Sequence, residues 1–311
     1  MLSNAYMPEG NLISTNENRE FLSSTDQLER AMREGRILEA PAVRCSNYLD
    51  LTVDLGCATG IINRDEVVFD PDDAPVKDIA VITRVGKPVA FKVTSMNGGK
   101  IRLSRKEAMR EAYINFISGL TPGDIINAKV THLEHFGAFV DIGCGFISLL
   151  PIDCVSVSRI SHPRDRLCVG SEFRVVVRSV DRDENGKPIR IYVSRRELLG
   201  TWQENASLFE AGQTVTGIVR SIESYGVFIE LAPNLAGLAE YRGDLVPGQG
   251  AAVYIKSIIP EKMKIKLAIV DSCRTLPPQD NFNSFIPESQ THISYWRYSP
   301  DPCPKLIESV F

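Results

Sequence analysis

Two matching pairs of aromatic residues, each flanking a glycine, are the side chains best suited to chemistry in this sequence. The stretches "HFGAFVDIG" (135–143) and "SYGVFIELA" (224–232) share the order aromatic, Gly, small, Phe, aliphatic, acidic. Strand residues alternate between faces, so placing the aliphatic residues inward puts the second ring of each pair outside and the first at a bend. An exposed ring gains roughly 1–3 kcal/mol by stacking on an unpaired base of any identity, although paired phenylalanines can also be core residues. The candidate base-stacking residues are Phe136, Phe139, Tyr225 and Phe228.

A basic stretch, "SRISHPRDR" (158–166), offers a second kind of chemistry. Its three arginines, Arg159, Arg164 and Arg166, lie close together. A planar guanidinium suits both phosphate oxygens and the faces of bases, so this loop could form the edge of an RNA groove. The open alternative is a solvated loop whose charges pair with Asp153 and Asp165.

The histidine and cysteine spacing does not indicate a metal site. His132 and His135 precede Cys144, but no second clustered pair accompanies them, so polar strand residues are the better interpretation. We keep His132 as a candidate RNA-binding residue. The seven cysteines are scattered and never form a C-x-x-C pair. We therefore expect no disulfide framework, no metal and no cofactor.

Composition sets broad limits on the class of protein. A chain of 311 residues that is 43% hydrophobic is long enough for two or three domains. A net charge of -4 gives no overall attraction to nucleic acid, so such a site must be local. There is no apolar run of bilayer length and no basic-then-apolar start, and we expect a cytoplasmic protein that does not enter membranes.

Sequence signatures of catalysis are absent. The chain has no G-x-x-x-x-G-K-[ST], H-E-x-x-H, G-x-S-x-G or G-x-G-x-x-G motif. We therefore expect a protein that is not an enzyme.

The aromatic stretches belong to longer repeats. "GDIINAKVTHLEHFG" leads into the first and "GQTVTGIVRSIESYG" into the second, and two further alternating segments follow each. A weaker copy upstream contains "LTVDLGCATGIINRDE" and ends at "SRKE". Each unit is typical of five short strands, which predicts small all-β barrels. The three predicted barrels span 36–106, 121–197 and 212–271.

Short helices are expected around these barrels. "SRKE" at 104 and "SRRE" at 194 are Ser-x-x-Glu capping boxes, which satisfy free amides at a helix start. They predict helical linkers over 107–120 and 198–211. In the N-terminal segment, 1–35, "STDQ" opens a helix "DQLERAMRE" that stops at Gly35.

The C-terminal extension, 272–311, is rich in proline and aromatic residues and has no sustained period. Its Tyr295, Trp296 and Tyr298 either dock on a barrel or form a binding element. We favour docking, because aromatic side chains bury large areas.

The motifs of the middle unit resemble a known RNA-binding repeat. "HFGAFVDIG", "VGSEFRVVVRSVD" and "IRIYVSRRE", in that order, are similar to the repeat named after bacterial ribosomal protein S-one. The resemblance is specific in the middle unit, good in the third and weak in the first. It implies an all-β chain of three tandem OB-fold barrels joined by short helices. Each such barrel binds single-stranded RNA through two aromatics, a histidine, an Asp and an Arg.

The resemblance assigns residues in the second and third units. In the middle unit it implies Phe136 and Phe139 as the rings, Asp181 as the acid and Arg190 as the base, while Pro151 takes the histidine position. In the third unit Tyr225 and Phe228 match and Lys264 is the base. There Glu240 replaces the histidine and Pro260 the acid.

The first unit keeps the pattern without the rings. Its aromatic positions fall on Leu49 and Thr52, its histidine position on Asn63 and its basic position on Lys100. Its loop "RDEVVFDPDDAPVKD" is acidic and should repel phosphate. We expect this barrel to contact protein or to act as a spacer, and the resemblance implies attachment to the small ribosomal subunit.

The leading hypothesis is a bacterial, non-catalytic protein that captures single-stranded RNA, mRNA in particular, during translation at the small ribosomal subunit, and is a monomer away from it. Two alternatives remain: a free RNA-binding regulator that never docks on ribosomes, and a scaffold of barrels that binds protein rather than RNA.

Overall fold

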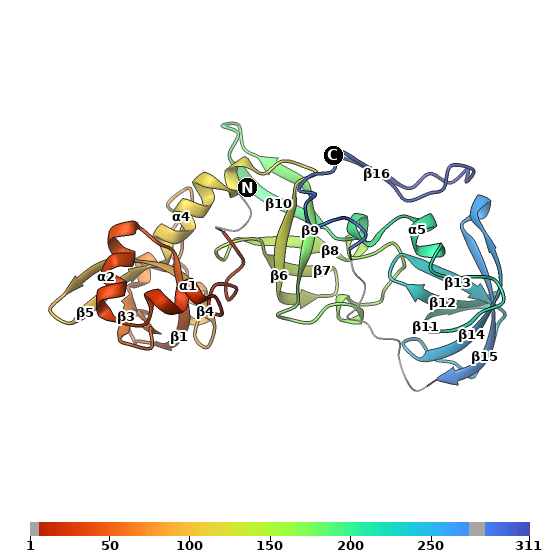
Figure 1. The fold of residues 1–311 in the computed structure, drawn as a ribbon, viewed down its shortest axis with the longest axis horizontal. Coiled ribbons are helices and arrows are strands. Elements are labelled where there is room, and N and C mark those ends of the chain that lie inside the picture. Colours follow the sequence, from red (N-terminus) through yellow and green to blue (C-terminus); the bar gives the residue numbers. More distant parts are fainter. Residues whose placement is uncertain (1–5, 274–283) are drawn as a thin grey trace. The chain divides into compact units, whose positions relative to one another are not determined.

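Three closed five-stranded barrels form most of the chain in the computed structural model, as the repeats predicted (Figure 1). The structure describes residues 6–273 and 284–311. In all three barrels the third strand pairs in parallel with the fifth, and the strand orders of the first and third barrels are β1-β2-β3-β5-β4 and β11-β12-β13-β15-β14. The middle barrel has the order β10-β8-β7-β6-β9.

The strands are short, and their burial patterns alternate where one face is core. In the first barrel they are β1 (Leu38–Cys45), β2 (Leu51–Asp54), β3 (Thr59–Ile62), β4 (Pro88–Asn97) and β5 (Lys100–Ser104). In the second they are β6 (Ile125–Glu134), β7 (Gly137–Asp141), β8 (Ile147–Pro151), β9 (Glu172–Arg182) and β10 (Pro188–Ser194). In the third they are β11 (Thr214–Glu223), β12 (Gly226–Ala232), β13 (Leu235–Ala239), β14 (Gly250–Ile259) and β15 (Lys264–Cys273).

The chain forms two compact units. Of the described residues, the first unit comprises 6–120 together with 127–129 and 141–147, and the second holds the rest of the middle barrel, the third barrel and residues 284–311.

The predicted N-terminal helix and first linker helix are confirmed. Helix α2 (Thr25–Glu34) begins after Ser24, whose hydroxyl accepts the Gln27 N–H, and ends at Gly35 with φ 65°. Helix α4 (Arg105–Asn115) begins after Ser104, which accepts the Glu107 N–H. The sequence prediction did not include two short helices, α1 (Asn16–Phe21) and α3 (Asp78–Ile82).

The second linker differs from the prediction. A 3-10 turn over Arg196–Leu199 replaces the start of the expected helix, Gly200 follows with φ 80°, and helix α5 (Trp202–Ala206) begins afresh. Thr201 caps α5 through a reciprocal pair of hydrogen bonds with Glu204. Glycine adopts this backbone conformation at little cost, and the new cap makes a separate helix favourable.

The described part of the C-terminal extension beyond β15, residues 284–311, docks on the third barrel, as predicted for two of its three aromatic residues, while residues 274–283 lie outside the described ranges. Trp296 and Tyr298 are buried in the core cluster of the third barrel, while Tyr295 is half exposed. The Tyr298 carbonyl accepts the Trp202 N–H at 3.0 Å. Two short strands, β16 (Tyr295–Arg297) and β17 (Glu308–Val310), pair within the extension.

A buried cluster of charges holds the N-terminal segment inside the first unit. Arg105 donates to both carboxylate oxygens of Glu9, at 2.6 and 2.9 Å, and the Glu9 N–H donates to Asp141 at 2.8 Å. Glu39 accepts the N–H groups of Gly10 and Leu12 through one oxygen. Burial above all, and then the charge of Glu9, raise the pKa of Glu39 to about 8. Burial likewise raises the pKa of Asp141 to about 7.

The raised pKa of Glu39 predicts that rising pH weakens the first unit. Between its ordinary pKa of 4.5 and about 8 the folded chain holds a proton that the unfolded chain has lost. Stability from this group is therefore full below about pH 4.5 and is lost as pH rises towards 8, with a slope of at most ~1.4 kcal/mol per pH unit. The Glu39→Gln variant cannot ionise, so its free energy of unfolding should depend less on pH. Urea denaturation followed by circular dichroism from pH 5 to 8 measures this.

The matched control is Glu29→Gln, an exposed glutamate of α2. Parallel pH profiles for wild type and Glu39→Gln would contradict the assignment.

Candidate nucleic-acid interface

The two predicted ring pairs adopt the same geometry on equivalent strands. Phe136 and Phe139 meet edge to face, with centroids 6.0 Å apart and planes at 90°. Tyr225 and Phe228 meet at 6.1 Å and 89°. The first ring of each pair is the more exposed, at 55% for Phe136 and 67% for Tyr225, and the second is half-buried on the outer face. An edge-to-face pair holds both rings in place while leaving aromatic surface in solvent.

The glycine between the rings is a packing requirement. A Cβ at Gly137 would lie 2.4 Å from the Leu150 carbonyl oxygen, and a Cβ at Gly226 would lie 2.4 Å from that of Ala239. In both barrels the second strand therefore starts against the backbone of the third, which fixes where the rings emerge.

Histidines extend the platform of the middle barrel. The ring of His132, on β6, stacks beside Phe139 with centroids 6.4 Å apart, and its Nε2 lies 2.7 Å from Glu134. The ring of His135 meets His162 edge to face at 4.7 Å. His132 thus adjoins the predicted rings, which supports its selection as a candidate.

Strand register places a further row of side chains beside the rings. In the third barrel, consecutive Cα partners run Phe228 to Leu238, Leu238 to Lys266 and Lys266 to Ser257. The middle barrel pairs Leu149 with Tyr192, and Tyr192 with Ser179, in the same strand order.

Sequence reasoning missed Tyr192 and Lys266. Both lie two residues beyond the assigned basic positions, Arg190 and Lys264, and strand alternation could have found them.

The assigned acid and base of the middle barrel lie opposite each other. Asp181 and Arg190 are Cα partners on β9 and β10, and both are exposed. In the third barrel the partner of Lys264 is Ile259. The residue opposite the base is thus one position before Pro260, and that barrel has no acid there.

The basic loop divides into two parts. Arg159 and Arg164 are exposed, as the groove-edge hypothesis requires. Arg166 lies elsewhere: its side chain is 6% exposed and donates to both carboxylate oxygens of Glu230, at 2.8 and 2.6 Å. It therefore cannot serve the groove edge without breaking a buried ion pair.

This loop connects the two ring pairs. At one end His162 contacts His135, the neighbour of Phe136. At the other end Arg166 binds Glu230, two residues after Phe228 on β12. A single short loop therefore lies between the two ring pairs and contacts both barrels.

Backbone hydrogen bonds hold the loop in place. The Ser158 N–H donates to the Pro233 carbonyl at 3.2 Å, and the Val157 N–H donates to the Asn234 side chain at 2.9 Å. The position of the loop on the third barrel thus rests on more than the ion pair.

The junction between these barrels is strongly basic. Arg220 also binds Glu230, at 2.6 Å, so two guanidinium groups share one buried carboxylate. Burial lowers the pKa of Arg166. Burial and the charge of Arg166 lower the pKa of Arg195 to about 10, and its guanidinium lies 4.4 Å from the Phe173 ring centre.

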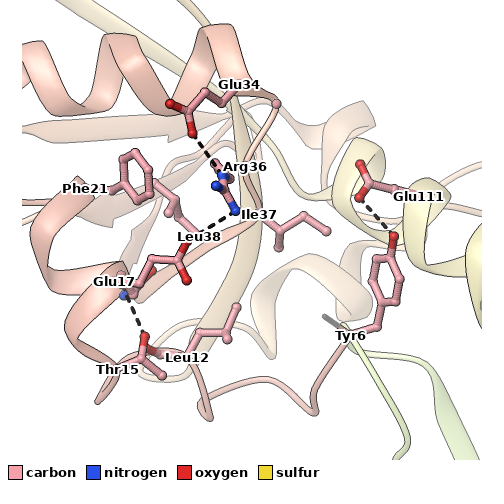
Figure 2. Close-up of a pocket in the computed structure, with 12 residues that line it drawn as sticks. Tyr6, Leu12, Thr15, Glu17, Phe21, Glu34, Arg36, Ile37, Leu38 and Glu111 are labelled. Carbon is pink, nitrogen blue, oxygen red and sulfur yellow. Dashed lines mark hydrogen bonds and ion pairs between the residues drawn. The ribbon is translucent and has the colours of Figure 1, made fainter. Parts of the chain in front are cut away.

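A pocket of about 540 Å³ lies in the first unit, among α1, α2 and the start of β1. Figure 2 shows Arg36 between Glu34 and Glu17, and Tyr6 against Glu111 on α4. Leu12, Phe21 and Leu38 supply its apolar lining. Three carboxylates, those of Glu17, Glu34 and Glu111, line the pocket with one arginine, Arg36, which makes this side of the unit unsuited to phosphate.

The described residues contain no group of three His, Cys, Asp or Glu that could hold a metal ion. Six cysteines of the described part are free thiols. In the same ranges no helix is long and apolar enough to span a membrane.

Comparison with known proteins identifies the repeat. Residues 120–191 match the S1 RNA binding domain. The chain is 31% identical over 238 residues to small ribosomal subunit protein bS1 of Staphylococcus haemolyticus, covering 70% of this chain and 58% of that protein. It is 29% identical over 223 residues to bS1 of Staphylococcus aureus strain COL, covering 66% and 54%. The solution structure of GSP13 from Bacillus subtilis is 32% identical, covers 25% of this chain and 56% of that one, and has a TM-score of 0.22.

The chain therefore belongs to the S1 family, and its middle barrel is an S1 RNA-binding domain. It spans little more than half the length of the curated relatives it matches. The family is one of RNA-binding and ribosomal proteins rather than enzymes.

The shared carboxylate at the junction predicts a large effect of its removal. Glu230→Gln leaves Arg166 and Arg220 buried without a counter-charge, which should cost about 3–5 kcal/mol of stability. Thermal unfolding followed by the fluorescence of Trp202 and Trp296, both in this unit, measures the loss.

Glu240→Gln is the matched control, since this exposed glutamate pairs with Lys256 in the same barrel and should change little. Equal melting temperatures for the two variants would refute a structural role for the buried triad.

Proposed function

We propose that the protein captures single-stranded RNA, mRNA in particular, by stacking bases on the ring pairs of its second and third barrels. The supporting observation is the repetition of one exposed edge-to-face pair on equivalent strands, with a single arginine-bearing loop between them. Unpaired bases present π-faces to such rings, whereas bases in a duplex are already stacked.

The remaining candidate residues have supporting roles in this proposal. Arg190 and Lys264 contact phosphates beside the rings, Asp181 orients Arg190, and His132 adds a further ring next to Phe139. Arg159 and Arg164, on the loop between the barrels, contact the phosphates of the RNA where it passes from one ring pair to the other. Two weak platforms in one compact unit bind together with greater avidity, because binding at the first raises the effective concentration at the second.

We propose further that this capture serves translation at the small ribosomal subunit, in the cytoplasm, with the first unit providing attachment and the protein otherwise monomeric. The curated relatives are small-subunit proteins, which supports this setting. The pocket of the first unit also supports it, because an apolar lining with an acidic rim suits a basic protein segment better than RNA.

Removing the rings of the middle platform should weaken RNA binding at every salt concentration. Phe136→Ala/Phe139→Ala removes two stacking partners, each worth roughly 1–3 kcal/mol, and leaves the phosphate contacts in place. Fluorescence anisotropy should show reduced affinity for an unstructured RNA and an unchanged dependence of log affinity on log salt. Wild type should bind duplex RNA less tightly than the unpaired strand.

Leu208→Ala/Leu306→Ala is the control, since these exposed side chains lie outside the barrel strands. If the ring variant binds as tightly as this control, the platforms do not stack bases and the scaffold alternative gains support.

Co-sedimentation separates a ribosomal from a free RNA-binding role. At low salt the protein should pellet with small ribosomal subunits, and Phe136→Ala/Phe139→Ala should still pellet because attachment is assigned to the first unit. A wild-type protein that stays in the supernatant would favour the free regulator.

A further inference from the structure

The first barrel has a complete outer row equivalent to the platforms of the other two. Its Cα partners run from Arg44 on β1 to Thr52, then to Ile61, Arg102 and Ser95. The third barrel has Ser221, Phe228, Leu238, Lys266 and Ser257 in the same strand order. Both rows also follow a register shift in the first strand, between Ala42 and Arg44 and between Val219 and Ser221.

Comparing the rows shows which positions are free to vary. The third strand supplies an aliphatic residue in every barrel: Ile61, Leu149 and Leu238. The fourth strand supplies a serine in every barrel: Ser95, Ser179 and Ser257. The fifth strand carries Tyr192 in the middle barrel, Lys266 in the third and Arg102 in the first. The backbone framework of the rows is thus the same. The first barrel has Thr52 instead of a ring on its second strand, and it has arginines, Arg44 and Arg102, on its first and fifth strands.

Neither Arg44 nor Arg102 has its charge balanced by an acidic partner in the described ranges, so both can bind an anionic ligand. Arg44 is exposed, and no acidic side chain in the described ranges forms an ion pair with it. Arg102 donates from Nη1 to the neutral Asn63 side chain at 2.5 Å, which orients the guanidinium and leaves its charge unbalanced.

Four of the nearby acidic side chains have partners other than Arg44 and Arg102. Asp54 accepts the Gly56 N–H and Asp50 accepts the Arg64 N–H, while Asp78 and Asp73 pair with Arg64 and Lys106. Asp78 and Asp73 of the acidic loop thus each have a basic partner, and the repulsion of phosphate expected from the loop's composition stays a prediction.

The turn between β1 and β2 also carries a ring. Tyr48 is 84% exposed and precedes Leu49, which has φ 65°. Ser46 accepts the N–H groups of Tyr48 and Asp50 and holds the turn. The resemblance assigned the ring position to Leu49, so the aromatic residue in this barrel lies one residue earlier.

We propose that this face of the first barrel is a third nucleic-acid contact, with Arg44 and Arg102 on phosphates and Tyr48 on a base. The proposal rests on the proposed function for its ligand, single-stranded RNA. The guanidinium group of an arginine binds two phosphate oxygens at once. An RNA that is already bound to the other barrels is held at a high effective concentration near this face. The acidic pocket lies at the other end of β1, so the two surfaces of the unit have opposite chemical preferences.

The test compares three variants of the full chain by anisotropy, with an unstructured RNA of about 30 nucleotides over a salt series. Arg44→Gln/Arg102→Gln should lower affinity roughly tenfold at 0.15 M salt and flatten the log-log salt slope by about 1.4, or about 0.7 for each phosphate that is no longer neutralised. Tyr48→Leu should lower affinity and leave the slope unchanged. Arg19→Gln/Arg33→Gln removes the same charge from exposed positions of α1 and α2 and should leave affinity near wild type.

A chain lacking all four rings of the other barrels separates this proposal from the proposed function. With Phe136, Phe139, Tyr225 and Phe228 replaced by alanine, the residual binding should be salt-sensitive and should disappear when the two arginine substitutions are added. If the four-alanine chain binds like wild type, stacking on those barrels fails, and the arginine comparison still decides the role of the first barrel. If the arginine variant matches Arg19→Gln/Arg33→Gln, the proposal is overturned. Loss of small-subunit co-sedimentation with unchanged RNA affinity would also overturn it, because the face would then contact protein.

Discussion

Closure of a five-stranded sheet is the constraint on which the rest of this structure depends. Once every strand has two hydrogen-bonded neighbours, sliding one strand would break pairing on both sides, so register is fixed around the barrel. Each outward position then has set neighbours, and Phe228, Leu238, Lys266 and Ser257 must lie side by side. The fold therefore determines which outward positions form a binding face, whichever side chains occupy them.

The close approach of glycine to the third strand shows how the core and the outer face are coupled. Gly137 and Gly226 leave no room for a Cβ, and this tight packing fixes where the neighbouring rings emerge. The same residues thus serve stability and recognition. The aromatic-Gly order repeats in the sequence because one packing solution is used in two barrels.

Buried charge joins the second and third barrels into one unit. Glu230 binds guanidinium groups from both barrels, Arg166 and Arg220, and lies two residues from a platform ring. A buried carboxylate with two partners cannot be released without leaving charge in a poorly solvated place.

The sequence by itself determined the barrels, their strand count, the capped helices α2 and α4 and the ring pairs. These depend on local patterns: alternation, glycine spacing and capping boxes lie within a few residues of each other. Tertiary structure alone decided the role of Arg166, which resembled its exposed neighbours in sequence but pairs with a residue 64 positions away. It also decided the outer rows that include Tyr192, Lys266 and Arg102, the break at Gly200 and the pairing of Asp73 with Lys106. Each of these depends on which strands become neighbours when the barrel closes or on which side chains meet across long separations, and no local window of sequence contains that information.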